Sequence, residues 1–230
     1  MKTLGLIGGM SWESTVPYYR KINEHVKERL GGLHSAKIIL YSVDFHEVEQ
    51  LQASGQWDDA GNLLADVAYK LETAGAQALV LCTNTMHKVA EAITSAVNIP
   101  LLHIADPTAQ AIQAAGYTRV GLLGTRFTME QDFYRQRLEQ AHGLTVLTPA
   151  AAERDQVHHI IYHELCLGQV HAASRQTYLS VIQNLQAQGA QAIILGCTEI
   201  ALLVKQSDCA LPLFDTTALH ARSAAEWAMS

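Results

Sequence analysis

The chain has 230 residues, of which 49% are hydrophobic and 17% are charged, a balance typical of globular proteins that bury one large core or two smaller ones. Its net charge of −6, without clustered lysine or arginine, argues against nucleic acid or an anionic membrane surface as a partner. No apolar run approaches the roughly 18 residues of a membrane span, and Gly8 and Gly9 interrupt the apolar start too early for a signal peptide.

The cysteines and histidines do not have the spacing of a metal site. The four cysteines show no CxxC spacing, which indicates neither a zinc knuckle nor a disulfide framework. His158, His159 and His163 stand at i, i+1 and i+5, so they do not share one helix face, and we expect no metal site. Together these features predict a protein of a reducing, cytoplasmic compartment.

The first predicted strand, Leu4 to Ile7, runs into Gly8 and Gly9 and is followed by a helical pattern. The apolar residues of that pattern are Val16, Tyr19, Ile22, Val26 and Leu30. The glycines have two interpretations: a tight strand-to-helix turn, or a close approach of backbone N–H groups to an anion such as a carboxylate. Their spacing fits neither GxGxxG nor a phosphate-binding loop, so a nucleotide site is not indicated.

The rest of the first half alternates strands with helices. Gly31 and Gly32 end the first helix. A strand over residues 37–44, helices over 45–51 and 57–73, a strand over 78–81, a helix carrying Val89, Ile93 and Val97, and a strand over 99–104 follow. Alternation at this length predicts parallel strands joined by right-handed crossovers, which is an α/β doubly wound sheet.

The second half repeats the first. Segments beginning at Val120, Gly189 and Leu211 resemble those beginning at Leu4, Gly75 and Ile99, at offsets of 116, 114 and 112 residues. Three such matches in one order predict a duplicated α/β unit, with two pseudo-symmetric lobes facing each other across a cleft. We expect lobe one over residues 1–100, completed by residues 206–230, and lobe two over 101–205. The last helix, Ala218 to Met229, is expected to pack on lobe one.

The most similar repeat segments are Gly75 to His87 and Gly189 to Ile200, and their ungapped alignment pairs Thr83 with Cys197. A pseudo-twofold axis places equivalent residues on opposite faces of a ligand, as the inversion of an α-carbon requires. No lysine has the sequence setting of a pyridoxal Schiff base, so such a reaction would use side-chain acids and bases alone. A lone cysteine is more often a core residue, but the repeat favours a catalytic Cys197. A helix N-terminus after it would lower its pKa from about 8.5.

Five motifs carry a resemblance to a known family. They are IGGMSWEST at 7–15, SVDF at 42–45, the turn Asn84 to His87, LLGTRFTM at 122–129 and LGCTEI at 195–200. These motifs resemble the pyridoxal-independent aspartate/glutamate racemase family over essentially the whole chain. The resemblance implies two α/β lobes with the active site between them, a homodimer, no cofactor, and a proton-abstracting pair at the two repeat turns. Its second-lobe member is Cys197.

The first repeat turn departs from that family. Members resemble Cys-Asn-Thr-x-His, whereas this chain has Thr83 at the cysteine position and Cys82 one residue earlier. Period-two alternation sends Cys82 to the opposite face of the strand, so we expect Cys82 in the core and Thr83 as the catalytic partner of Cys197. A threonine hydroxyl is a much weaker base than a thiolate. Since the resemblance assigns the L-isomer to Cys197, turnover is expected to be faster from L than from D.

The resemblance also implies a set of substrate-binding residues, whose hydroxyls and backbone N–H groups would hold the α-carboxylate. These are Met10, Gln52, Asn84, Thr85, Thr125, Thr128, Thr198 and Glu199. Each threonine or asparagine alone is equally well interpreted as a helix cap or turn residue. Gln52 is neutral, and no lysine or arginine occurs between Asp155 and Arg175, which argues against strict specificity for acidic substrates.

Three functions remain open at this stage. The first is a racemase of aspartate and glutamate, or of a wider set of amino acids. The second is a sister enzyme of the same fold, such as a hydantoin racemase or a maleate isomerase. The third is a two-lobe amino-acid binder in which Thr83 marks lost chemistry. Exchange of the substrate α-proton in D₂O separates the three.

Overall fold

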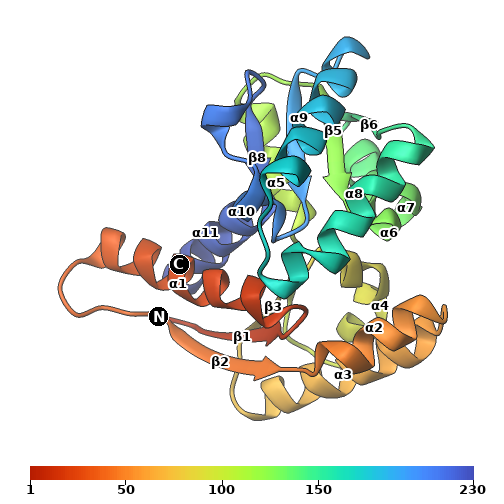
Figure 1. Ribbon diagram of the computed structural model, residues 1–230. Coiled ribbons are helices and arrows are strands. Elements are labelled where there is room, and N and C mark those ends of the chain that lie inside the picture. Colours follow the sequence, from red (N-terminus) through yellow and green to blue (C-terminus); the bar gives the residue numbers. More distant parts are fainter. The chain divides into compact units, whose positions relative to one another are not determined.

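The computed structural model describes residues 1–230, which form two four-stranded parallel sheets with flanking helices (Figure 1). The first sheet has the order β2 (Lys37–Ser42), β1 (Thr3–Gly8), β3 (Ala78–Leu81), β4 (Leu101–Leu102). The second has the order β6 (Thr145–Leu147), β5 (Arg119–Gly124), β7 (Ala192–Gly196), β8 (Leu213–Asp215). The same order in both sheets is what a duplicated unit predicts, and the doubly wound α/β class is confirmed.

The chain divides into two compact units whose limits differ from those expected. Unit 1 comprises Met1–His103 and His220–Ser230, and unit 2 comprises Ile104–Leu219. The repeat pattern assigned residues 206–219 to the first lobe, but β8 in this segment pairs with β7. The segment therefore completes the sheet of unit 2, and only the residues from His220 onward return to unit 1.

Helices cover both faces of the sheet in unit 1. One face packs against α1 (Trp12–Leu30) and the part of α11 (Thr216–Met229) from His220 onward. The other face packs against α2 (Phe45–Ala53), α3 (Trp57–Thr73) and α4 (Ala90–Ser95). Side chains of β3 and of the next residue alternate between the two cores: Leu79 and Leu81 point to one, Val80 and Cys82 to the other. This alternation is the period of a strand buried on both faces.

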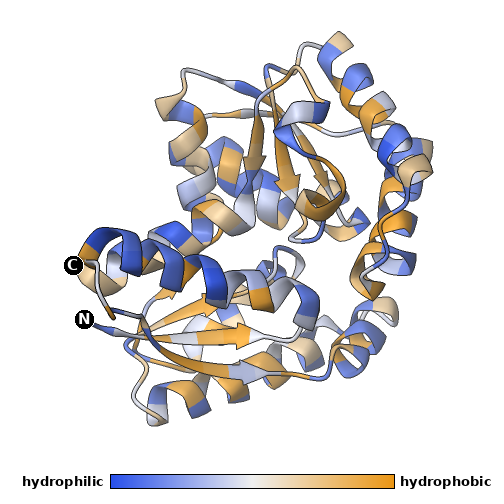
Figure 2. Ribbon diagram, turned by 60° about the vertical axis from the view of Figure 1, so that its left-hand side comes forward, coloured by the Kyte–Doolittle hydropathy of each residue, from blue (hydrophilic) through white to orange (hydrophobic).

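Unit 2 has the same layering. One face packs against α5 (Ala105–Ala114), α7 (Asp132–Gln136) and the π-helix η2 (Arg137–Ala141). The other packs against α6 (Arg126–Glu130), α8 (Ala151–His163), α9 (Ala172–Ala187) and α10 (Ile200–Leu203). In both sheets the strands are largely apolar, and the helices carry their polar residues on the outside (Figure 2). None of the helices combines the length and the apolar composition that crossing a bilayer requires.

Helix α1 buries only part of the stripe that the sequence pattern suggested: Ile22 and Val26 face the core as expected, whereas Val16, Tyr19 and Leu30 do not. Tyr18, Ile22 and Val26 are buried against the sheet, whereas Val16 and Tyr19 are 47% and 55% exposed. The apolar residues of this helix are spread over more than one face, so periodicity alone does not select the stripe that packs. The predicted end of the helix is confirmed: Gly31 has φ 72° and its N–H donates to the carbonyl of Lys27.

The strand order places loops from two strands at one sheet edge in each unit. The chain leaves β1 toward β2 on one side, while β3 lies on the other side of β1, and the second sheet repeats this arrangement with β5. Ligands of open α/β sheets bind at the carboxyl ends of strands at such a switch point. The loops after β1 and β3, and after β5 and β7, are therefore where a site is expected. After β3 comes the 3₁₀ helix η1 (Thr85–Val89), followed by α4.

Candidate active site

The predicted site residues form two groups, one at the switch point of each sheet. In unit 1, β1 and β3 pair with Ile7 beside Leu81, so both strands end at the same level. In unit 2, β5 and β7 pair with Gly124 beside Gly196. The residues that follow these strands are Met10, Thr83, Asn84 and Thr85 in unit 1, and Thr125, Thr128, Cys197, Thr198 and Glu199 in unit 2. All nine are at most 9% exposed.

The turn after β1 uses its glycine for close packing. Gly9 has φ 92°, and a Cβ there would collide with the backbone of Val43. Its N–H donates to Oγ1 of Thr15 at 2.8 Å. At Gly9 the structure therefore supports the tight-turn interpretation, because this amide is already engaged within the protein. Met10 packs with the core of unit 1 that contains Leu79 and Leu81.

Gln52 approaches the unit 1 group from helix α2. Its side chain is 4% exposed, and its Nε2 donates to Sδ of Met86 at 2.9 Å. Met86 lies in η1, directly after Thr85. The amide is thus held beside the turn that follows β3, although Gln52 is distant from that turn in sequence.

The two candidates for the first catalytic position have opposite environments. Cys82 is fully buried among side chains of α1 and α11, and its Sγ donates to the carbonyl of Val80 at 3.7 Å. Burial raises the pKa of the Cys82 thiol far above its usual range. The prediction that Cys82 packs in the core is confirmed. Thr83 is 8% exposed, and its carbonyl accepts a hydrogen bond from Nδ1 of His87 at 2.8 Å.

The turn after β5 is a capped helix start. Oγ1 of Thr125 accepts from the N–H of Thr128 at 3.3 Å, and the two hydroxyl oxygens are 3.2 Å apart. Thr125 has the extended backbone of an N-cap. The capping interpretation is therefore confirmed at Thr125, and the separate contact between the two hydroxyls holds that of Thr128 beside it.

A buried carboxylate gathers the polar side chains of the turn after β7. Oε2 of Glu199 accepts from Sγ of Cys197 at 3.0 Å and from Oγ1 of Thr198 at 2.6 Å. Oε1 of the same carboxylate accepts from Sγ of Cys166 at 3.7 Å. Glu199 is only 2% exposed. Its oxygen atom is placed to accept the proton of the Cys197 thiol, which would leave a thiolate.

The environment of Cys197 corrects one expectation from the sequence. A helix N-terminus was expected to lower the thiol pKa, but α10 is a single turn. Burial and the neighbouring carboxylate of Glu199 instead raise the pKa of Cys197 well above its usual range. The resting side chain is therefore a thiol, and forming the thiolate requires transfer of its proton to a nearby base.

Comparison with known proteins identifies the family. The family model described as Asp/Glu/hydantoin racemase matches residues 7–224. The chain belongs to this racemase family.

Relatives of this racemase cover its full length. A crystal structure from Yersinia pestis, of a protein provisionally named an Asp/Glu racemase, is 61% identical and covers 100% of both chains, with a TM-score of 0.93. An aspartate racemase homologue from Pyrococcus horikoshii is 34% identical over 100% of both chains, with a TM-score of 0.85. The broad-specificity amino-acid racemase of Bacillus subtilis is 25% identical and covers 96% of this chain and 95% of its own. The family and the relative from Bacillus subtilis are named as racemases, a class of isomerases.

One residue contacts the candidate site although the sequence contained no signal for it. Cys166 lies in the short 3₁₀ helix η3 (Leu165–Leu167), outside both repeat turns, and reaches Glu199 only through the fold. The three clustered histidines of α8 make contacts of a different kind. Nδ1 of His158 accepts from the backbone N–H of Arg126 at 3.2 Å, and the ring centroids of His159 and His163 lie 4.3 Å apart. No group of three or more His, Cys, Asp or Glu side chains is arranged to hold a metal ion.

Proposed function

We propose that this racemase interconverts L- and D-amino acids, including aspartate and glutamate, with Cys197 and Thr83 as the acid–base pair and no cofactor. The observation that carries the proposal is the hydrogen bond from Cys197 to the buried carboxylate of Glu199. It lies at the end of β7, and Thr83 occupies the corresponding position after β3 in the duplicated sheet. Support for amino-acid substrates comes from the aspartate racemase homologue and the broad-specificity amino-acid racemase among the relatives.

Conversion of the L-isomer begins at Cys197. The thiol proton passes to Oε2 of Glu199, 3.0 Å away, and the thiolate then removes the α-proton. The hydroxyl of Thr83 delivers a proton to the opposite face of the α-carbon and is then reprotonated by water. When Glu199 loses its proton again, every group has returned to its starting state and only the configuration of the substrate has changed.

Hydroxyl and amide groups at the sheet edges hold the substrate carboxylate in this proposal. Asn84, Thr85 and Thr198 follow the two repeat strands, while Thr125 and Thr128 follow β5. Gln52 contributes a neutral amide beside Met86. A neutral side chain imposes little charge selection, which favours acceptance of several amino acids. We also propose a homodimer, on the family resemblance, which light scattering during gel filtration tests directly.

The description of the matching family supplies a second candidate substrate. It names hydantoin racemases beside those of aspartate and glutamate. A hydantoin carries an acidic C–H at its ring carbon, so the same two-sided proton transfer would racemise it. The remaining alternative is a two-lobe amino-acid binder that lacks catalytic activity because Thr83 stands where family members have a cysteine.

Proton NMR in D₂O tests these candidates. Pure L-aspartate, L-glutamate, L-alanine and a 5-substituted hydantoin are each incubated with the protein in the absence of pyridoxal phosphate. The α-proton signal and the enantiomeric composition are then followed. Loss of the signal with formation of the D-isomer supports the proposal, and reaction of the hydantoin alone supports the second candidate. Saturable binding without any exchange would leave the binder as the correct function.

A further inference from the structure

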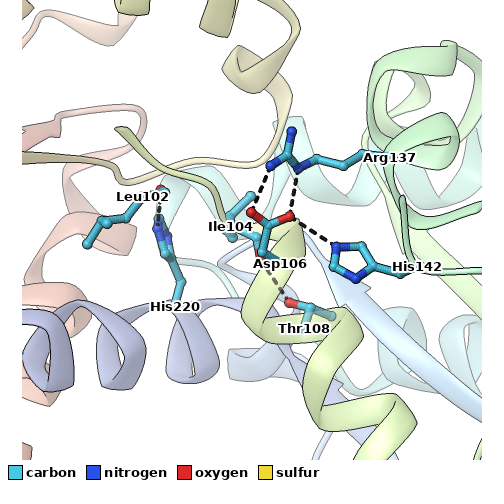
Figure 3. A network of polar contacts seen from close by, with 7 residues as sticks. All are labelled: Leu102, Ile104, Asp106, Thr108, Arg137, His142 and His220. Carbon is cyan, nitrogen blue, oxygen red and sulfur yellow. Dashed lines mark hydrogen bonds and ion pairs between the residues drawn. The ribbon is translucent and has the colours of Figure 1, made fainter. Parts of the chain in front are cut away.

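Two histidine residues mark where the chain leaves and re-enters unit 1. It leaves after His103 and returns at His220, which is fully buried. Nε2 of His220 lies 2.7 Å from the carbonyl oxygen of Leu102 (Figure 3). Because a carbonyl oxygen can only accept, Nε2 carries a proton and donates it. One hydrogen bond within unit 1 therefore joins the outgoing segment to the returning one.

The other ring nitrogen of His220 is held by helix α1. The hydroxyl of Tyr18, a fully buried residue, lies 2.9 Å from Nδ1 of His220. In the neutral ring with its proton on Nε2, Nδ1 is the acceptor and Tyr18 donates. The rings meet edge-on with their centroids 5.6 Å apart. The ring of His220 cannot rotate without breaking both of these hydrogen bonds.

A third histidine connects this pair of segments to the turn that carries Thr83. Nδ1 of His87 donates to the carbonyl of Thr83 at 2.8 Å, since the carbonyl can only accept. The ring centroid of His87 lies 4.4 Å from that of His103 and 6.1 Å from that of His220. His87 is 3% exposed. Its ring thus bridges the Thr83 backbone and the two residues at which the chain leaves and re-enters the unit.

We propose that His87 is a positioning residue for Thr83, and that His103 and His220 fix the orientation of its ring. This inference rests on the proposed function, in which the Thr83 hydroxyl delivers a proton. Thr83 lies beyond the last residue of β3, outside the ladder of the sheet. The hydrogen bond from His87 orients the carbonyl of Thr83, and with it the direction in which the Thr83 side chain points. Proton delivery to carbon depends steeply on such placement, because the donor must be aligned with the carbanion.

The ratio of exchange to inversion isolates this role. In D₂O the deprotonated L-substrate has two fates: Cys197 returns a solvent-derived deuteron, which gives exchange without inversion, or Thr83 delivers one, which gives the D-isomer. Slower delivery from Thr83 leaves more time for return from Cys197. A misplaced Thr83 therefore raises the ratio of exchange to inversion, whereas general damage to the site lowers both rates together.

Two substitutions at His87 separate the hydrogen bond from the volume of the side chain. His87→Leu keeps the approximate volume and removes the donor, and we expect the ratio to rise about fivefold or more. His87→Asn places an amide N–H near the position of Nδ1, and its ratio is expected to lie between those of wild type and His87→Leu. His220→Leu tests the support behind the ring and should raise the ratio as well. Tyr18→Phe removes only the hydrogen bond to His220, so it should raise the ratio less than His220→Leu does.

His25→Leu is the matched control. His25 is a half-buried histidine of α1 that faces Glu226 at 3.6 Å, away from the His87 contacts described above. Its ratio is expected to stay within about twofold of wild type. An unchanged ratio in His87→Leu, with wild-type exchange intact, overturns the inference and leaves the proposed function standing. Absence of exchange in the wild type overturns both.

Discussion

At the scale of single residues, the cysteines of the racemase differ in environment far more than in sequence setting. Cys197 contacts Glu199, Cys82 packs among core side chains, and Cys209 is a partly buried neighbour of the unit 2 core. We predict that Cys197→Ser abolishes α-proton exchange from the L-isomer while stability changes by only about 1 kcal/mol. Cys82→Ser and Cys209→Ser should retain exchange. NMR in D₂O measures all three, and a Cys82→Ser variant as inactive as Cys197→Ser would show that Thr83 is not the partner.

Glu199 is predicted to be the base that activates Cys197. Glu199→Gln keeps a hydrogen-bond acceptor near the thiol but removes the basic carboxylate, so kcat from the L-isomer should fall by roughly 10²- to 10⁴-fold. Because the pKa of Cys197 is raised, the remaining activity should increase with pH as hydroxide forms the thiolate. Glu164→Gln, at a carboxylate that binds Ser174, is the control. Kinetics over a pH series measure this, and wild-type rates in Glu199→Gln would assign the carboxylate a purely structural role.

Thr83 is predicted to limit the reaction from the D-isomer. A hydroxyl is a poor base for an α-proton, so kcat from D should be lower than kcat from L. The equilibrium constant between enantiomers is one, hence kcat/KM is equal in both directions and KM for the D-isomer falls in step. Thr83→Cys should raise kcat from D and bring the two kcat values together. Initial rates with each pure enantiomer check this, and equal wild-type kcat values would contradict it.

At the scale of elements, the turn between β1 and α1 depends on a close approach that only glycine permits. Gly9 has φ 92°, and a Cβ added there would collide with the backbone of Val43, whereas Gly75 has φ 99° and a Cβ added there would have nothing within 4 Å. Gly75→Ala therefore carries backbone strain alone, and Gly9→Ala carries strain and a collision. We expect Gly9→Ala to lose about 2 kcal/mol or more of stability beyond the loss in Gly75→Ala. Urea unfolding measures the free energy of unfolding of both variants. Equal losses would mean that the backbone around Gly9 shifts to accommodate the added Cβ.

At the scale of the whole molecule, two buried thiols couple stability to pH. Burial raises the pKa of Cys82, and burial with the Glu199 carboxylate raises that of Cys197, so both stay protonated in the folded state. Above the unfolded thiol pKa of about 8.5, the unfolded chain binds fewer protons, and stability falls as pH rises by up to about 1.4 kcal/mol per unit for each thiol. Denaturation between about pH 8 and 10 should show this slope. Cys82→Ser should reduce it, and an unchanged slope would contradict the assignment.

Short-range pattern in the sequence was enough to predict the strands, their parallel arrangement and the place of Cys82 in the core. Alternation along a strand is set by the geometry of the chain itself and needs no partner to be predicted. The duplicated segments likewise showed that Thr83 and Cys197 occupy equivalent positions.

Only packing decided the remainder. Two features depend on contacts between segments distant in sequence. They are the choice of α1 residues that are buried and the pairing of β8 with β7. The pKa of Cys197 was predicted in the wrong direction because its sign depends on burial and on Glu199, whereas the sequence showed only the start of a helix. Cys166 joins that carboxylate from a segment with no motif. Local geometry follows from neighbours in the chain, but electrostatics and packing follow from neighbours in space.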